Sequence, residues 1–499
     1  MARSARRRSV LGVAAFGAMA WGSGLSATTP APVSPVVREN RRKGDTGWVA
    51  SENVSDKLRQ IQGYPSATSV NAGGSISFHV TVAVPQTFTV SLYRLGSYHG
   101  AGGRLAYTSP KLSGRPRPVP APDPVTGLID CGWPSSWTFK VPADWLSGLY
   151  LAVFKTRDGH RAVTPFVVRN DARRADFLMI VPVTTYNAYN VWPADGRTGK
   201  SLYKGYLPNG KMGGAPERAY QVSFNRPYYG GGRPTWFNLD VATAQFMEKS
   251  GYDVAYATSI DLHQGRIDPA RYRALIFSGH DEYWSGAMRD VVEKAIRNNT
   301  HCAFLAANNI YWNIRVEADP RGVAGRVVTC YKSAPDPAPD ETGDTDLWRN
   351  LGTGQSSAEA RLMGTQYNGI LRAPVPLVVR GAGHWMWEGT GVHDGDRIKD
   401  LVAVEADGWF AGLPTDYQAE QTLLSASPYP DSLGRGDRIQ NTSICETPDG
   451  TIMFTAGTFH WPLALAKSAY TDARIQRATK NLFDRFIRTE PGAPRPAVR

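Results

Sequence analysis

Phe177-Leu178-Met179-Ile180-Val181 is an uninterrupted apolar stretch, and it decides the fold class. A strand without polar alternation is typical of a parallel sheet that is covered on both faces. Similar short stretches follow at residues 252–256, 274–277 and 302–305. Helical patterns separate them, one from 239 to 250 before Gly251 and one that begins at the N-cap candidate Ser285. Strands that alternate with helices predict a doubly wound α/β domain over residues 175–490.

The preceding region, residues 58–170, carries the alternating pattern of half-buried strands. Residues 75–82 place their apolar side chains on one face. Comparable segments lie at residues 88–92, 137–141, 149–154 and 165–169. Turn signals such as Gly73-Gly74 and Asp158-Gly159 separate them. The sequence therefore predicts a multi-domain chain in which an Ig-like β-sandwich precedes the α/β domain.

The N-terminus has the composition of an export signal. Arg6-Arg7-Arg8-Ser9-Val10-Leu11 is a twin-arginine pattern, and a short apolar stretch follows it. We expect residues 1–27 to be a twin-arginine-type signal peptide and the protein to be exported, with an ordinary secretion signal or a retained anchor as the alternative. Residues 28–57 are rich in proline and small residues and are expected to be a linker. No further run of about 18 apolar residues occurs, so no integral membrane segment is expected after signal removal.

Charge and cysteine content exclude several classes. The chain has 499 residues and a formal net charge of +12, and four of its arginines lie in the leader. The remaining charge forms no basic stripe, so no nucleic-acid partner is expected. Four cysteines allow at most two disulfides, with Cys330–Cys445 as one open pairing, and their spacing is not that of a zinc site. Neither GxSxG, nor a Walker A motif, nor HExxH is present, which disfavours serine hydrolases, NTPases and zinc proteases.

Ligands of an open parallel sheet bind at the carboxyl ends of its strands. That rule selects three segments that are expected to be loops, residues 184–190, 278–284 and 306–309, which should converge at one edge. In the second segment, His280 and Glu282 are candidates for an acid/base pair or for metal ligands. The structural alternative is a capping cluster, because carboxylates are favoured at the start of the helix that follows.

Gly279-His280-Asp281-Glu282-Tyr283-Trp284-Ser285 resembles the Gly-His-x-Glu-Tyr-Trp-Ser signature of the N,N-dimethylformamidase large (beta) subunit family. Thr185–Asn190, followed by Ser201-Leu202-Tyr203, resembles an earlier block of that family. Further matching blocks lie at residues 93–98, 308–312, 401–407 and 457–461. The resemblance covers roughly residues 60–490. It implies a class I glutamine amidotransferase-like α/β fold and a mononuclear Fe³⁺ ion held by two tyrosines and a glutamate.

The motifs carry over as specific roles. The resemblance implies Tyr189, Tyr203 and Glu282 as metal ligands, with Tyr186 as an open alternative to Tyr189. It implies His280 and Glu405 as catalytic residues, with Glu420 as the alternative to Glu405. The expected substrate pocket contains Tyr186, Asn308 and Trp284. Phenolate and carboxylate oxygens are hard donors, which suits a highly charged cation.

We therefore expect an exported, iron-dependent hydrolase of a non-peptide C–N bond that acts on a small-molecule amide. One alternative is a secreted carbohydrate or cell-wall binding protein with a degenerate α/β domain. Another is a metal-free acid/base hydrolase that uses His280 and Glu282. The chain shows no sign of the small partner subunit of the family enzyme, and a homo-oligomer remains an open alternative.

Overall fold

The computed structural model describes Met1, residues 33–332 and residues 334–488. The chain divides into two compact units, Met1–Val33 and Ser34–Arg499, and the description below concerns the second. Apart from Met1, the expected signal peptide lies outside the described residues. No helix within the described part is both long and apolar enough to cross a membrane.

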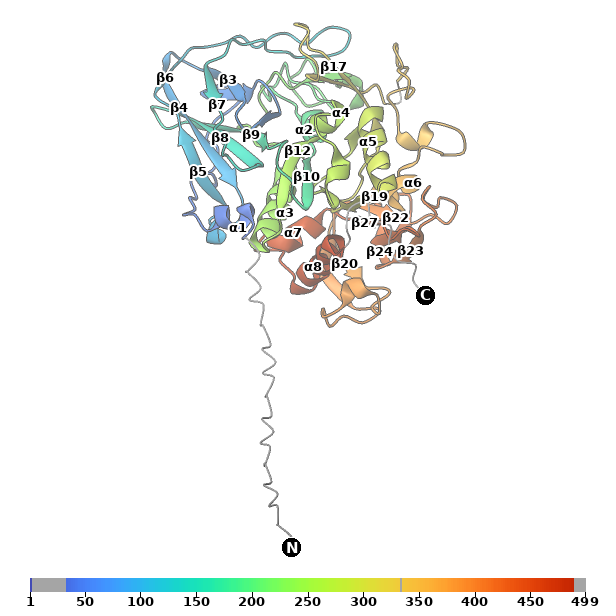
Figure 1. Cartoon of the computed structure of the whole chain (residues 1–499). Helices are drawn as coiled ribbons and strands as arrows, with labels where there is room; N and C mark the ends of the chain where they lie inside the picture. Colours follow the sequence, from blue (N-terminus) through green and yellow to red (C-terminus); the bar gives the residue numbers. More distant parts are fainter. Residues whose placement is uncertain (2–32, 333, 489–499) are drawn as a thin grey trace. The chain divides into compact units, whose positions relative to one another are not determined.

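A seven-stranded sheet forms the centre of the second unit (Figure 1). Its order is β12 (Val254–Thr258), β10 (Phe177–Val181), β13 (Ala274–Phe277), β15 (His301–Phe304), β27 (Ile452–Thr455), β26 (Ser443–Glu446) and β23 (Glu420–Leu423). The pairings from β12 to β27 are all parallel, and β26 pairs antiparallel with both of its neighbours. The strands predicted at residues 177–181, 274–277 and 302–305 are confirmed, because each lies within or overlaps a strand of this sheet.

Both faces of β10 are buried, which explains its uninterrupted apolar sequence. Phe177, Met179 and Val181 belong to one hydrophobic core, together with side chains of α3 (Phe237–Lys249) and α8 (Ala473–Ile487). Leu178 and Ile180 belong to a second core, together with α5 (Gly286–Arg297). Successive side chains of a strand point to opposite faces, so the side chains of β10 alternate between the two cores.

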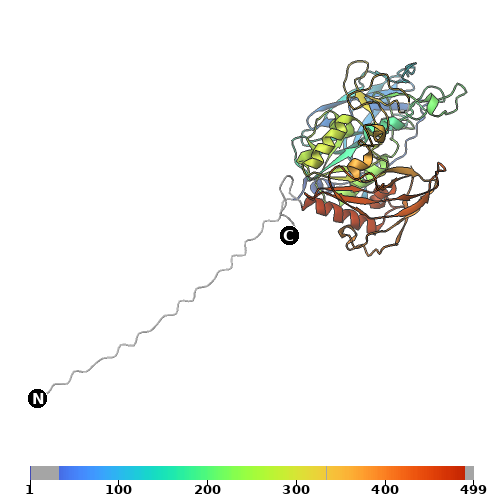
Figure 2. The ribbon, with the colours of Figure 1, turned by 90° about the vertical axis from the view of Figure 1, so that its right-hand side faces the viewer.

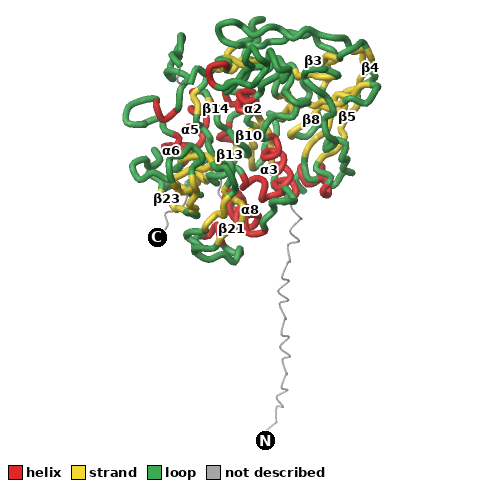
Figure 3. Tube along the Cα trace, turned by 180° about the vertical axis from the view of Figure 1, so that it is seen from behind, coloured by secondary structure: helices red, strands yellow, loops and turns green. Residues whose placement is uncertain are grey.

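The ends of α5 and α3 are those predicted from the sequence. The Ser285 side chain accepts a hydrogen bond from the Met288 amide and caps α5. Gly251 follows α3 with a φ of 85°, a conformation that glycine adopts without a steric penalty. The chain between such elements is largely loop (Figure 3).

The N-terminal strands form two further sheets. One has the order β2-β9-β8-β4-β5, with β6 paired to β4, and the other has the order β1-β3-β7. Their bounds are β1 (Ile61–Pro65), β2 (Ser69–Asn71), β3 (Ser75–Val82), β4 (Gln86–Leu95), β5 (Gly103–Thr108), β6 (Leu112–Gly114), β7 (Trp137–Lys140), β8 (Gly148–Thr156) and β9 (Arg161–Arg169). Alternate residues of β3 enter one core with side chains of β4, β8 and β9. The Ig-like and amidotransferase-like assignments stay predictions.

Strands late in the chain lie together in the part of the molecule that also holds α8 (Figure 2). They pair as β19 (Gln366–Ile370) with β22 (Glu405–Gly408), β20 (Val375–Val378) with β21 (Arg397–Val402), and β24 (Ser427–Pro430) with β25 (Asp437–Gln440). β22 is bridged to Thr458, two positions before α7 (His460–Ala466). This bridge brings β22 to the sheet edge where the candidate residues gather.

Two segments expected to be irregular are helical. The segment 28–57, expected to be a linker, contains α1 (Pro35–Asn40), because Ser34 caps it and Pro35 suits the first helical turn. Val36 at its start is fully buried. Residues 184–190, expected as a loop, mostly form α2 (Val183–Tyr189). Tertiary burial overrides the modest helix propensity of its threonine and tyrosine residues.

The four cysteines form no disulfide in the structure. Cys302, Cys330 and Cys445 are buried thiols, and Cys131 is partly buried. The open pairing of Cys330 with Cys445 is therefore not realised.

Candidate active site

The loops that follow neighbouring strands bring three oxygen-bearing side chains together. Tyr189 is the last residue of α2, which follows β10, and Glu282 lies on the loop after β13. Tyr203 belongs to a loop that returns toward α2. The Tyr203 hydroxyl donates to Oε1 of Glu282 at 2.6 Å, and the Tyr189 hydroxyl donates to Oε2 at 2.8 Å. The two hydroxyl oxygens are 3.1 Å apart.

His280 adds a nitrogen to this cluster. Its Nε2 lies 3.0 Å from Oε2 of Glu282 and 3.3 Å from the Tyr189 hydroxyl. Its Nδ1 is 3.0 Å from the carbonyl oxygen of Ala307, and since a carbonyl only accepts, Nδ1 carries a proton. Burial lowers the pKa of His280, but the hydrogen bond and charge of Glu282 outweigh burial and raise it to about 9.

Glu405 approaches from the start of β22. Its Oε2 lies 3.9 Å from Nε2 of His280 and accepts a 2.9 Å hydrogen bond from the Asn308 amide. Burial raises the pKa of Glu405 to about 7. Glu420, the alternative from the sequence, is an exposed residue on the edge strand β23. The geometry therefore joins Glu405, and not Glu420, to His280.

The sequence did not predict three residues that contact this cluster. The indole N–H of Trp312 donates a hydrogen bond to Oε1 of Glu282 at 3.0 Å. The Thr185 hydroxyl accepts a hydrogen bond from the backbone amide of Glu282 at 3.0 Å. The ammonium of Lys332 lies 3.4 Å from the ring centroid of Tyr203, within the range of a cation–π interaction. Trp312 stood in one of the matching blocks, whereas no sequence signal marks Lys332.

Several backbone positions around the cluster are strained. Five non-glycine residues there have left-handed φ angles: Trp236 (68°), Asn308 (54°), Ile310 (56°), Lys332 (57°) and Val404 (65°). Val404 is β-branched, for which this conformation is costly. Such residues persist only where the surrounding structure over-determines them, and they concentrate at functional sites.

Tyr186 and Trp284 lie outside the cluster. The Tyr186 hydroxyl donates to Oδ2 of Asp240 on α3, and its side chain is fully buried. Trp284 is fully buried against Phe277, with ring centroids 5.1 Å apart. The predicted substrate pocket of Tyr186, Asn308 and Trp284 is thus not formed as one group, since only Asn308 reaches the cluster.

The capping alternative for the acidic pair does not describe Glu282. Ser285 is the N-cap of α5, while both carboxylate oxygens of Glu282 contact tyrosines. Asp281 is buried, and neither of its carboxylate oxygens has a hydrogen-bond partner among the described residues. Burial raises the pKa of Asp281 to about 8, which favours its neutral form.

Comparison with known proteins identifies a family. Residues 89–473 match the family model described as "N,N-dimethylformamidase beta subunit-like, C-terminal". The chain belongs to this family. It is similar to the N,N-dimethylformamidase beta subunit of Alcaligenes sp, with 22% identity over 74% of this chain and 56% of that protein. The beta subunit from Paracoccus aminophilus gives 22% identity over 73% and 55%. This family member therefore spans about half the length of the curated relatives it matches.

Similarity to solved structures is weak. Spo0M, a sporulation control protein from Bacillus subtilis, aligns over 23% of this chain and 49% of its own, with a TM-score of 0.15. A β-glucosidase from Listeria innocua covers 22% and 16%, with a TM-score of 0.14. A cycloisomaltooligosaccharide glucanotransferase from Paenibacillus sp. covers 64% and 61%, with a TM-score of 0.17. Scores this low carry no argument about fold or function.

The oxygen cluster of this family member fits a hard cation. It consists of the two tyrosine hydroxyls and both carboxylate oxygens of Glu282, which lie within hydrogen-bond distance of one another, and such hard oxygen donors suit a highly charged cation. Across residues 33–332 and 334–488, no group of three or more His, Cys, Asp or Glu side chains is arranged to hold a metal ion. A metal at this position would thus depend on the tyrosine oxygens.

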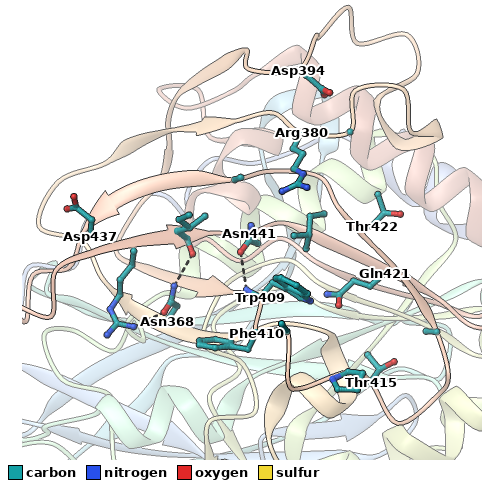
Figure 4. A pocket seen from close by; sticks show the side chains of 18 of the residues that line it. Asn368, Arg380, Asp394, Trp409, Phe410, Thr415, Gln421, Thr422, Asp437 and Asn441 are labelled. Carbon is teal, nitrogen blue, oxygen red and sulfur yellow. Dashed lines mark hydrogen bonds between the residues drawn. The ribbon is translucent and has the colours of Figure 1, made fainter.

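A separate groove of about 1160 Å³ lies on the C-terminal strands of this family member (Figure 4). Trp409 and Phe410 line it together with polar side chains. Within it, the Trp409 amide donates to the Asn441 side chain at 3.0 Å. Trp409 directly follows β22, whereas Glu405 begins that strand, so the groove and the cluster are at opposite ends of one strand.

Proposed function

We propose that this chain hydrolyses the C–N bond of small-molecule amides and that Tyr189, Tyr203 and Glu282 hold a mononuclear Fe³⁺ ion. The observation that carries the proposal is the convergence of these three side chains from separate segments onto one point, with His280 beside them. Membership of the N,N-dimethylformamidase beta subunit-like family supports an amide substrate. The name of the relatives belongs to longer proteins, of which this chain covers only 55–56%, so the substrate class is our proposal.

A bound ferric ion would supply a Lewis acid for the amide carbonyl and lower the pKa of a water molecule. The protein's own groups handle protons. Nδ1 of His280 faces the carbonyl oxygen of Ala307, whereas its Nε2 faces Oε2 of Glu405. This carboxylate oxygen can accept a proton from the attacking water. Asn308 fixes the carboxylate of Glu405, because its amide donates to the same oxygen. A carboxyl with a pKa of about 7 can both take up and return a proton near neutral pH.

Neighbouring residues hold Glu282 in position. Trp312 donates a hydrogen bond to one carboxylate oxygen, and the Thr185 hydroxyl accepts one from the backbone amide of Glu282. These bonds restrict rotation of both the side chain and the backbone of Glu282. The strained backbone conformations of Asn308 and Val404 orient the Glu405 side chain. Proton transfer from Glu405 to the departing amine nitrogen would complete the cleavage of the C–N bond.

We also propose export through the twin-arginine route. This rests on Arg6-Arg7-Arg8-Ser9-Val10-Leu11 and the short apolar stretch behind it. Export of a folded chain would allow the metal to be loaded before transport. Cell fractionation of the natural host tests this, with an Arg6→Lys, Arg7→Lys, Arg8→Lys variant as the matched control. Equal amounts outside the cytoplasm for both chains would contradict the proposal.

A metal-free acid/base hydrolase is the second candidate, because Nε2 of His280 lies 3.0 Å from Glu282, within reach of direct proton transfer. One experiment separates the two. The full chain is purified, its iron is measured by mass spectrometry, and its visible spectrum is searched for a phenolate-to-iron charge-transfer band. A panel of small amides, N,N-dimethylformamide included, with esters and glycosides is then assayed with iron, with zinc and after chelation.

We expect about one iron per chain, a visible band, and amide turnover that chelation abolishes. Glu282→Ala should remove the iron, the band and the turnover together. Unchanged turnover after complete chelation would favour the metal-free candidate instead. A metal-free, colourless protein without activity toward any amide would contradict the proposal as a whole.

A further inference from the structure

Two buried arginines have no carboxylate hydrogen-bond partner among the described residues. Arg226 and Arg326 are 2% and 4% exposed. Arg226 donates to the carbonyl oxygens of Trp192, Lys200 and Asn190 at 2.8–3.3 Å. Arg326 donates to the side-chain oxygen of Asn225 and to the carbonyls of Pro65 and Phe224 at 2.9–3.1 Å. Every acceptor in these bonds is neutral, so their hydrogen bonds leave two buried positive charges without a counter-charge.

The nearest carboxylates are already engaged. Asp130 and Asp319 both accept hydrogen bonds from Asn225 at 2.8 Å. Both also pair with one nitrogen of Arg321, at 3.2 and 2.8 Å. Three guanidinium groups therefore face two carboxylates in this cluster, which leaves one positive charge in excess.

The other titratable groups nearby do not supply the missing charge. Burial raises the pKa of the Cys131 thiol well above its ordinary value, and burial lowers the pKa of His79. Both are therefore neutral at neutral pH. Burial lowers the pKa of Arg226 and of Arg326 only to about 10, so both guanidiniums remain charged. Burying a charge without a partner is costly in free energy.

Both arginines line one small cavity. Its volume is about 20 Å³, and Arg226, Arg326, Tyr228, Asn187 and Thr68 provide its polar lining. Its other lining residues are Pro65, Pro165, Val183 and Phe224. No carboxylate lines it, and the Nε–H of Arg226 has no acceptor in the described part of the chain. A space of this size holds one water molecule or one monatomic ion.

We propose that this cavity binds a single monatomic anion, chloride under ordinary conditions, as the counter-ion of Arg226 and Arg326. Two guanidiniums attract an anion and repel a cation, and the apolar lining excludes a larger hydrated oxyanion. The anion neutralises the excess charge of the cluster, which water cannot do.

The site supports the segment between Tyr189 and Tyr203, the two tyrosines proposed as metal ligands. The carbonyl oxygens that Arg226 binds belong to residues 190–200, which connect Tyr189 to Tyr203. Asn187, another lining residue, lies on α2 two positions before Tyr189. An anion that fixes the Arg226 guanidinium therefore stabilises the loop between both tyrosines, and this holds whatever reaction the protein catalyses.

Crystallography with bromide tests the site directly. Crystals of the full chain are grown with sodium bromide in place of sodium chloride, and anomalous differences are measured at the bromine edge. We expect an anomalous peak inside the cavity, in contact with both arginines. A water molecule without anomalous signal, or bromide that enters only at molar concentration, would overturn the proposal.

Thermal unfolding tests it in solution. Sodium gluconate is replaced stepwise by sodium chloride at constant ionic strength, and the melting temperature is recorded. Wild type should show a saturable rise in Tm of about 3–5 °C. Arg326→Gln should abolish the chloride dependence, whereas Arg197→Gln, an exposed control, should retain it. A rise that never saturates, or one shared by Arg326→Gln, would refute specific binding, and the bromide crystals decide the matter if Arg326→Gln does not fold.

Discussion

The hydroxyl oxygens of Tyr189 and Tyr203 lie 3.1 Å apart, although 14 positions separate the two residues in the chain. Backbone contacts bring them there. The Leu202 amide donates to the Ala188 carbonyl at 3.0 Å, which aligns the positions directly before both tyrosines. Their rings also pack together, with centroids 4.5 Å apart. The pair is therefore pre-organised by the fold, which is the property that a ligand set requires.

Removal of either hydroxyl should release the metal. Tyr189→Phe and Tyr203→Phe retain the ring packing but each deletes one oxygen donor. We expect iron affinity to fall by at least about 100-fold in both, since even residues behind the ligands contribute 10–100-fold. Iron content and the visible absorption band of the purified variants measure this.

Tyr186→Phe is the matched control, because Tyr186 lies on the same helix but donates to Asp240. It should keep its iron and its colour and melt at a lower temperature, since Asp240 loses a buried donor. Loss of iron from Tyr186→Phe together with its retention in Tyr189→Phe would show that the ligand assignment is wrong.

Glu405→Gln should impair turnover without releasing iron. The substitution preserves the shape of the side chain and an oxygen for the Asn308 amide, but it removes the proton acceptor. General acid–base groups contribute about 10²–10⁴-fold, so we expect kcat to fall in that range. Steady-state kinetics measure the fall in kcat, and iron analysis of the purified variant checks that the iron content is unchanged.

Glu420→Gln provides the control, since Glu420 is exposed on β23. Its kcat should equal that of wild type. The role of Glu405 would be rejected if Glu405→Gln turned over at the wild-type rate, or if Glu420→Gln were the impaired variant.

The strands of the central sheet could be predicted because their signal is local. Five consecutive apolar residues predict β10, and a serine that can cap a helix predicts the start of α5. His280 and Glu282 could be selected for the same reason, since they directly follow β13. Helix α2 could not be predicted, because its stability comes from buried contacts of Thr184, Thr185 and Tyr186 and not from intrinsic propensity.

The remaining parts of the site depend on long-range contacts. Lys332 reaches the ring of Tyr203 from a residue 129 positions later, and no periodicity encodes that approach. Tyr186 and Tyr189 occupy one helix three positions apart, so the motif cannot say which one faces Glu282. The structure distinguishes them, because one hydroxyl meets Asp240 and the other meets Glu282.

The ion pair between Arg94 and Glu248 should control the stability of the second unit. The two guanidinium nitrogens lie 2.7 and 2.8 Å from the two carboxylate oxygens, and both side chains are fully buried. Arg94 is on β4 and Glu248 on α3, so the pair joins the N-terminal sheets to the α/β region. Arg94→Met leaves the carboxylate buried without its partner, which should lower the free energy of unfolding by about 3–5 kcal/mol. Urea denaturation measures it.

The double variant Arg94→Met, Glu248→Met serves as the comparison. Removal of both charges should restore much of the lost stability, because no buried charge is then left unpaired. Should the double variant be less stable than Arg94→Met alone, the ion pair would not be the origin of the effect.

Asp240 should make stability fall as the pH rises. Burial raises its pKa to about 7, even though Ser278 and Tyr186 donate hydrogen bonds to it. Between about pH 4 and pH 7 the folded protein keeps a proton on Asp240 that the unfolded chain releases. The free energy of unfolding should therefore decrease by up to about 1.4 kcal/mol per pH unit from this residue. Below about pH 4 both states are protonated and the effect ends.

Asp240→Asn removes the titration while it keeps an acceptor and a donor for Tyr186 and Ser278. Urea denaturation at half-unit steps from pH 4.5 to pH 7 should give a shallower decline for Asp240→Asn than for wild type. Asp437→Asn, at an exposed position of β25, should follow wild type. Parallel curves for wild type and Asp240→Asn would mean that Asp240 is ionised in the folded protein throughout this range. The Tyr186 hydroxyl would then donate to a buried carboxylate over the whole range, and Tyr186→Phe would destabilise the protein about as much at pH 4.5 as at pH 7.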